Sequence, residues 1–232
     1  MRFFSWALLI LANPFAYLPE CVTWACGEHL AQALGRTATG RWRQVIELML
    51  LLCVEMREHV IGFNETVGNS LDHLHLVSHR PLTGQGLYPL QQVAARLTAG
   101  ERAGVAHIGL ANGYPIDVWR IAFADIVKTV AVGEEILARW QSIGGDSASA
   151  NCTAIIEDGV PVLYLVPRSK LLKPWGWSSM PACVETHGLF IGAHEWEVSR
   201  VRHGAWGYNH FSQVLASLRP PGVGRLYLPP EF

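Results

Sequence analysis

Alternating apolar and polar stretches predict strands in the first part of the chain. Residues 4–11 and 21–26 are apolar runs separated by a turn at residues 13–15, which together predict a β-hairpin. After residue 40 the pattern changes to a period of three and four, which predicts an amphipathic helix with an apolar face made of Trp42, Val45, Ile46, Met49, Leu50, Cys53 and Val54. Two further predicted strands follow, at residues 60–64 and 73–79.

A second series in the same order begins after the middle of the chain. Residues 106–110 and 118–123 predict strands, and Asp125 is placed to cap a helix that ends near residue 142. The strongly apolar residues 151–157 and 160–166 are separated by Asp-Gly, which predicts a hairpin. The second half therefore repeats the element order of the first.

Loop signals place a boundary between these two series. Gly-rich and Thr-rich stretches at residues 83–86 and 98–101 mark loops, so we place the boundary near residue 100. We predict an α+β protein with two lobes, residues 1–100 and 101–232, each with an antiparallel sheet and packed helices.

The composition is that of a globular protein rather than of a disordered or strongly charged one. Of the 232 residues, 50% are hydrophobic, and the formal net charge is only -1. Since no basic run is present, polymeric nucleic acid is not an expected partner. The apolar stretch at residues 45–56 is too short to span a bilayer and contains Glu47 and Glu55, so we expect no membrane-spanning helix.

The cysteines and the first residues of the chain indicate the cellular compartment in which the protein is expected. The five cysteines are odd in number, widely spread and without a C-x-x-C pair, which favours neither a disulfide framework nor a cysteine zinc site. Residues 1–12 imitate a signal peptide, but they have a single arginine and no small-x-small cleavage site before residue 13. We therefore expect a cytoplasmic protein.

The most distinctive stretch combines a polar loop with a histidine-bearing strand. In an extended strand, His73, His75, Val77 and His79 share one face, because successive side chains alternate. The small and amide residues that precede them, Gly68-Asn69-Ser70, can turn backbone N–H groups toward an anion. This combination favours chemistry at phosphorus, with an imidazole as nucleophile.

The segment Gly68-Asn69-Ser70-Leu71-Asp72-His73-Leu74-His75 resembles the histidine-triad superfamily, in particular its nucleotidyltransferase branch. That branch contains galactose-1-phosphate uridylyltransferase, diadenosine tetraphosphate phosphorylase and GDP-galactose phosphorylase. Residues 13–32, 151–169 and 184–188 are also similar to segments of the branch, in the same order. The resemblance implies a HIT-like fold with the substrate over the histidine strand.

The same resemblance implies roles for individual residues. His75 matches the histidine that attacks an α-phosphate and becomes nucleotidylated, and His73 matches its phosphate-binding companion. The expected substrate-binding residues are Asn64, Gly68, Asn69, Ser70, His79, Arg168 and Lys170, the last two as partners for a distal phosphate. No cofactor or metal is expected.

The implied activity is nucleotidyl transfer or phosphorolysis. The expected substrate is a nucleoside diphosphate sugar or a dinucleoside polyphosphate, and the acceptor is inorganic phosphate or a sugar phosphate. The sequence leaves base, sugar and oligomeric state open.

One departure from the branch keeps two alternatives open. The transferases normally carry glutamine two residues after the nucleophile, where this chain has Val77, which cannot donate a hydrogen bond. The chain could therefore be a catalytically altered nucleotide-binding relative. Alternatively, His73, His75, His79 and Asp72 could ligate a metal, since histidines two apart on a strand can chelate zinc.

Overall fold

The computed structural model describes residues 8–12, 18, 20–26, 41–68, 73–81, 88–97, 104–192 and 194–226. In its first half the predicted order of strand, strand, helix, strand, strand recurs, followed by a short helix. These elements are β1 (Leu8–Ala12), β2 (Val22–Cys26), α1 (Arg41–Glu55), β3 (Val60–Asn64), β4 (His75–His79) and α2 (Pro89–Leu97).

The second half repeats this order and then adds helices. Its elements are β5 (Gly104–Ile108), the 3₁₀ turn η1 (Leu110–Asn112), β6 (Val118–Ala122), α3 (Ile126–Gly144), the 3₁₀ turn η2 (Gly145–Ser147), β7 (Ala148–Glu157), β8 (Val160–Ser169), α4 (Cys183–Thr186), α5 (Glu195–Arg202), α6 (Tyr208–Ala216) and the 3₁₀ turn η3 (Val223–Arg225).

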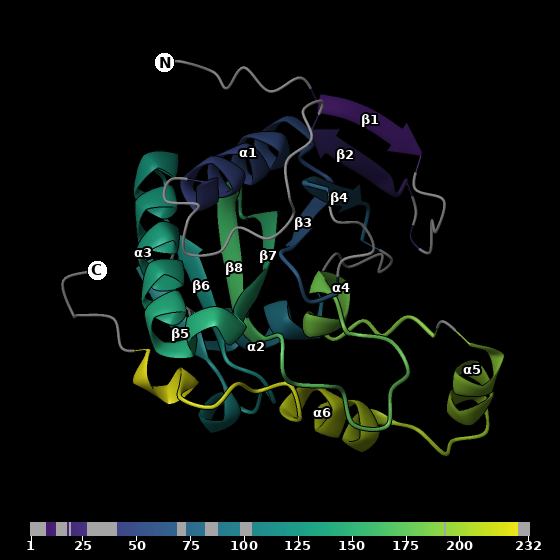
Figure 1. Ribbon diagram of the computed structural model, residues 1–232. Coiled ribbons are helices and arrows are strands. Elements are labelled where there is room, and N and C mark those ends of the chain that lie inside the picture. The colour runs from purple at the N-terminus through teal and green to yellow at the C-terminus, as the bar shows by residue number, and fades with distance from the viewer. Residues whose placement is uncertain are drawn as a thin grey trace.

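The strands form one continuous antiparallel sheet of eight strands in the order β1-β2-β4-β3-β7-β8-β6-β5 (Figure 1). The sequence predicted a separate sheet in each lobe, and this part of the prediction is wrong for the described residues. The reason is the pairing of β3 with β7, in which Ile61 lies opposite Ala154 and Asn64 opposite Asn151. The α+β class is confirmed, while the lobe boundary near residue 100 stays a prediction.

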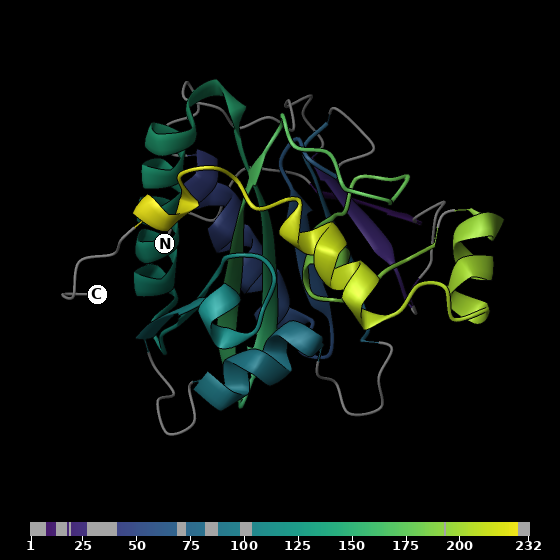
Figure 2. The ribbon, with the colours of Figure 1, turned by 90° about the horizontal axis from the view of Figure 1, so that it is seen from below.

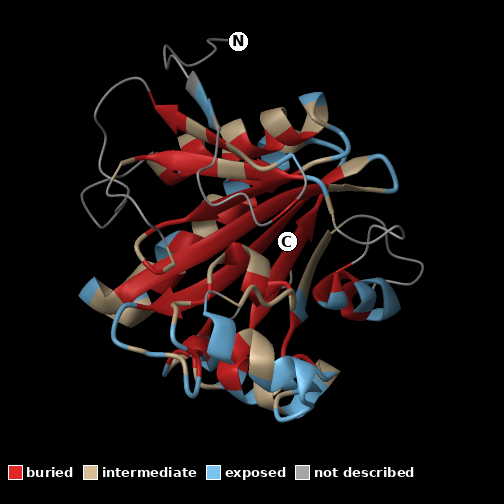
Figure 3. Ribbon diagram, turned by 90° about the vertical axis from the view of Figure 1, so that its right-hand side faces the viewer, coloured by how far each residue is buried: buried red, intermediate tan, exposed pale blue. Residues whose placement is uncertain are grey.

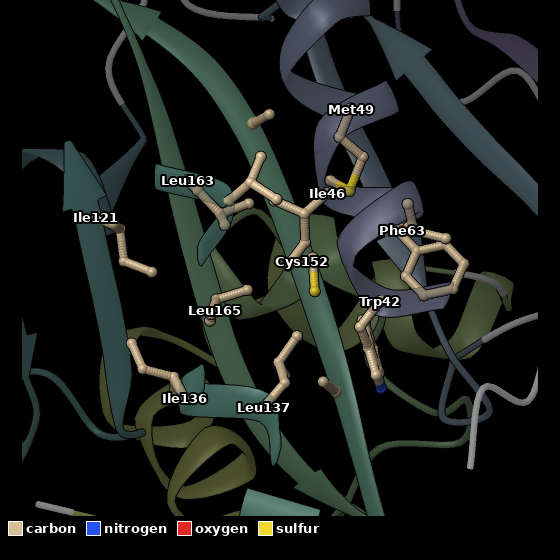
Figure 4. Close-up of a cluster of buried hydrophobic side chains, with 14 of the residues drawn as sticks. Trp42, Ile46, Met49, Phe63, Ile121, Ile136, Leu137, Cys152, Leu163 and Leu165 are labelled. Atoms are coloured by element: carbon tan, nitrogen blue, oxygen red, sulfur yellow. The ribbon is translucent and has the colours of Figure 1, made fainter. Parts of the chain in front are cut away.

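One face of the sheet is covered by α1 and α3, which lie side by side (Figure 1). The apolar face predicted for the first helix is the buried face of α1, because Trp42, Ile46 and Met49 all lie in the core. Figure 4 shows them facing strand residues from both halves of the sheet, among them Phe63 of β3 and Cys152 of β7. The larger apolar core therefore joins the two halves.

The other face is covered by α2 and α6, which lie close to each other in Figure 2. Leu90 and Val93 of α2 and Leu215 of α6 pack with strand residues such as Val162 and Tyr164. Figure 3 shows that buried residues follow the strands, with exposed residues gathered at the outer helices. Among the helices of the described ranges, none is both long and apolar enough to cross a membrane.

The periodic elements agree with the sequence prediction, and two details differ. Asp125 caps α3 as predicted, because its carboxylate accepts a hydrogen bond from the Val127 N–H at 2.9 Å. Helix α2 was not predicted. Strand β5 lies two residues earlier than predicted, since Gly109 begins a turn in which its N–H donates to the Asn112 side chain at 3.2 Å.

Candidate active site

Strand β4 presents His75 on the sheet face opposite α1 and α3. Leu74 and Leu76 lie in the core beneath those helices, so alternation along the strand turns His75 and Val77 to the other face. His75 lies opposite Ala25 of β2, and its exposed fraction is 6%. The nucleophile predicted from the sequence thus stands at the beginning of a central strand.

The ring of His75 is oriented by a backbone hydrogen bond. Its Nδ1 lies 2.7 Å from the carbonyl oxygen of His73. A carbonyl oxygen only accepts, so Nδ1 carries the proton, and in the neutral ring Nε2 then holds the lone pair. This is the tautomer that a nucleophilic imidazole needs at Nε2.

Burial also favours the neutral form of this ring. It lowers the pKa of His75 below its usual value, and the proximity of His73 lowers it further, whereas the bond to the His73 carbonyl acts in the opposite direction. A lowered pKa leaves the imidazole unprotonated at neutral pH. The neutral imidazole therefore needs no separate base to act as a nucleophile.

His73 lies immediately before β4 rather than within it. Its Nε2 donates to the carbonyl oxygen of Cys26 at 2.7 Å, so the ring ties the loop before β4 to the end of β2. This contact fixes the residue whose carbonyl orients His75. The predicted role of His73 as a phosphate donor stays a prediction.

Asn64, at the end of β3, is the centre of a buried hydrogen-bond network. Its side-chain oxygen accepts from the Asn151 amide at 2.8 Å and from the Cys183 N–H at 2.8 Å. Asn151 also donates to the carbonyl of Val67 at 2.9 Å. The network joins β3, β7, the start of α4 and the loop that leads toward the histidine strand, and direct contact of Asn64 with a ligand stays a prediction.

Arg168 completes this network from β8. Its guanidinium donates to the Asn151 side-chain oxygen and, at 2.8 Å, to the carbonyl of Pro181. Burial lowers the pKa of Arg168 to about 10, and the nearby Glu185 carboxylate counteracts this. Because these donors point into the protein, the geometry favours a structural role over the predicted contact with a distal phosphate. Lys170 is exposed beyond the strand end and is not brought into the network.

Gly68 occupies the loop between β3 and the histidines. Its φ is +85°, and a Cβ there would lie 2.8 Å from the Ala182 Cα, so the position accepts only glycine without strain. Asn69 and Ser70, which the sequence analysis placed beside it as anion-binding residues, lie outside the described residues. The predicted anion loop is therefore described only up to Gly68.

His79 is at the far end of β4 and packs inside the protein. Its ring meets Tyr88 edge-on with 6.3 Å between ring centroids, and its Nδ1 donates to the Arg80 carbonyl at 3.1 Å. It is 2% exposed, and burial lowers its pKa. The geometry favours packing over substrate contact for this residue, whose predicted role stays untested.

Sequence reasoning missed several other polar residues buried on the same face. Asn151 was noted only as the beginning of a hairpin, although its position inside an apolar strand was a signal. A second network is also buried there, in which Arg120, Tyr164 and Gln91 all donate to the Glu157 carboxylate at 2.6 to 3.0 Å. These residues come from separate elements, so no motif united them.

The metal alternative gains no support within the described ranges. In that part of the chain no three His, Cys, Asp or Glu side chains come together as a metal-ligand group. Asp72, one of the four suggested ligands, lies outside the described residues.

Comparison with known proteins gives a match in structure and none in sequence. No family model and no curated protein sequence matches the chain. The yeast Ap4A phosphorylase Apa2 is similar in structure, with a TM-score of 0.60 at 15% identity over 93% of this chain and 74% of Apa2. Its complex with AMP has a TM-score of 0.62 at 15% identity, with the same shares covered, and its complex with Ap4A has 0.60 at 13% identity over 91% and 73%.

These matches confirm the resemblance predicted from the histidine strand, at the level of the fold. They extend over both halves of the chain, as do the segments on which the resemblance was based. The chain has the fold of Ap4A phosphorylase Apa2.

Proposed function

We propose that this protein transfers a nucleoside monophosphate, or releases it by phosphorolysis, through a covalent adduct on His75. The substrate is a nucleoside diphosphate sugar or a dinucleoside polyphosphate, and the acceptor is inorganic phosphate or a sugar phosphate. The proposal rests mainly on the hydrogen bond from His75 Nδ1 to the His73 carbonyl, which leaves the lone pair on Nε2. The shared fold supports it, because Apa2 has been crystallised with Ap4A and with AMP.

The reaction divides into two displacements at the same phosphorus. In the first, the Nε2 lone pair of His75 forms a bond to the α-phosphorus, and the bond from that phosphorus to the bridging oxygen breaks. In the second, an oxygen of the acceptor attacks the phosphorus, the phosphorus–nitrogen bond breaks, and Nε2 recovers its lone pair. Each step has a lower barrier than a direct exchange, because imidazole is both a good nucleophile and a good leaving group.

The Asn64–Asn151–Arg168 network has a positioning role in this proposal. It holds the Val67 carbonyl, and with it the loop that approaches the histidine strand, through the Asn151 amide. Backbone donors of that loop act on the phosphoryl oxygens, where a well-placed donor contributes about 3 kcal/mol to a transition state.

Intact-mass measurement tests the proposal directly. The purified protein is incubated without acceptor, separately with nucleoside diphosphate sugars and with dinucleoside polyphosphates, and then weighed. We expect a mass increase of one nucleoside monophosphate that disappears on addition of the acceptor. The increase should be absent in His75→Ala and unchanged in His203→Ala, whose histidine is exposed at the end of α5.

Val77 favours a second candidate, a nucleotide-binding protein without turnover. Its partly buried side chain is on the face of His75 and offers no hydrogen-bond donor. In that case the same incubation gives no mass increase, while calorimetry still detects binding of the nucleotides.

A further inference from the structure

A pocket of about 240 Å³ lies between α2 and α6, away from the histidine strand. Figure 2 shows these two helices close together on one side of the sheet. The pocket is smaller than the several hundred Å³ of a site for a drug-sized ligand, so it suits one single or fused ring. Its lining is chiefly apolar and aromatic, with Val93, Tyr114, Phe190, Tyr208, Phe211 and Leu215 among the residues.

The aromatic walls of this pocket are held by contacts of their own. The phenol of Tyr114 donates to the carbonyl of Thr186 at 2.6 Å, so its hydroxyl is bonded inside the protein. Phe190 and Phe211 stack with 4.4 Å between ring centroids, and Trp177 meets both rings edge-on. A planar ligand therefore meets a preformed set of ring faces and edges, which lowers the entropic cost of binding.

The charged side chain that lines this pocket is positive. Arg96, in the last turn of α2, belongs to its lining, and none of the described residues that line it is acidic. Within the described part of the chain, Arg96 forms no ion pair. Gln92 and Ser212 add neutral polar groups. An unpaired guanidinium beside an apolar cavity favours a ligand that has one anionic group at its edge.

The pocket is separate from the site around His75. No residue of β4 lines it. The contact of β4 with the α2 region is at its opposite end, where His79 meets Tyr88. Occupation of the pocket therefore does not require the nucleotide chemistry proposed above.

We propose that this pocket binds a planar aromatic carboxylate. The ring lies among Tyr114, Phe190 and Phe211, and the carboxylate pairs with the guanidinium of Arg96, whose planar fork matches its two oxygens. A single arginine balances the single charge of a carboxylate, whereas the dianion of a phosphate monoester would keep an uncompensated charge at an apolar cavity.

Ligand-observed NMR with a matched pair of probes tests this inference. Indole-3-carboxylate has the ring and the charge, and indole-3-carboxamide has the same shape without the charge. We expect the carboxylate to bind about tenfold more tightly than the amide, because a charge-assisted hydrogen bond to arginine contributes at least that much. Arg96→Gln should lower the affinity for the carboxylate to that for the amide.

Two variants keep the result specific to this pocket. Arg139→Gln, which removes a half-buried arginine of α3, and His75→Ala should both leave the affinity unchanged. Arg96 is exposed, so its replacement leaves the fold intact, which a thermal melt verifies. Absence of binding, equal affinity for acid and amide, or unchanged affinity in Arg96→Gln would each overturn the proposal. So would competition by AMP, or loss of binding in His75→Ala, because both place the probe in the histidine site.

Discussion

Strands β4 and β8 occupy the same place in the two halves of the sheet, yet they contribute different things. Each is the strand directly next to the central β3–β7 pair, on its outer side. On the face opposite α1 and α3, β4 presents His75 with an oriented ring, while β8 presents Tyr164 and Arg168, both bonded to other side chains. Strand β4 provides the candidate nucleophile, whereas β8 provides side chains of the hydrogen-bond network that holds the neighbouring loop.

The sharpest test of this division compares stability after replacing each residue. Arg168→Met keeps the volume but leaves the Asn151 oxygen and the Pro181 carbonyl without their donor, so we expect the free energy of unfolding to fall by about 3 kcal/mol. His75→Ala should lower it by less than half as much. Urea unfolding measures both. Arg139→Met, which breaks a partly exposed pair within α3, should lower the free energy of unfolding by less than about 0.5 kcal/mol. An equal loss of unfolding free energy in Arg168→Met and Arg139→Met would mean that the buried network does not stabilise the fold.

Replacing Gly68 tests whether the loop after β3 needs the close contact of Gly68 with Ala182, which precedes α4. Gly68→Ala should lower the free energy of unfolding by about 2 kcal/mol, from both the positive φ and the contact with Ala182. Gly159→Ala is the matched control, because Gly159 has φ +80° with nothing within 4 Å of an added Cβ. We expect it to cost only about 1 kcal/mol. A difference below the error of the unfolding curves would contradict the close approach.

Replacing Val77 tests whether β4 lacks a hydrogen-bond donor that the reaction needs. Val77→Gln supplies a donor on the face of His75, and we expect the rate of adduct formation to rise about tenfold, since one such donor contributes at least that much. Stopped-time intact-mass measurement gives the rate. Val77→Leu should give no increase, which separates a donor from a change in packing. If the glutamine variant is no faster, position 77 does not face the reacting phosphate.

The pH dependence of adduct formation is the smallest expected effect. Burial lowers the pKa of His75 from the usual histidine value of 6.5, so the nucleophilic neutral form persists above the lowered pKa and is lost as pH falls through it. Between pH 8 and pH 6.5 the rate should therefore fall by less than about twofold. A fall to half by pH 7 would mean a raised pKa and a differently placed ring.

The sequence predicted the elements well because their signals are local. The period of apolar residues defined α1 and α3, and a short turn between two apolar runs defined the β7–β8 hairpin. The pairing of β3 with β7 was missed. These strands are far apart in the sequence, and the hydrophobic pattern of one strand does not indicate which distant strand it pairs with. Helix α2 was missed between two loop signals.

The same distinction separates the predicted from the unpredicted parts of the site. His75 was predicted as the nucleophile because histidines two apart and a small-residue loop form one continuous motif. The bonds among Asn64, Asn151 and Arg168 join three strands; Asn64 and Arg168 were predicted as substrate-binding residues, but no local motif indicated that Asn151 connects them. A buried polar side chain inside an apolar strand is the signal that such reasoning can use.

The packing of α1 has a consequence for how the molecule holds together. This helix belongs to the first half of the chain but lies against β7 and β8 of the second as well as against β3. If the chain were severed between α2 and β5, each fragment would keep its own hairpins but expose hydrocarbon that the other normally shields. The two halves are thus mutually dependent for folding, even though each repeats the plan of the other.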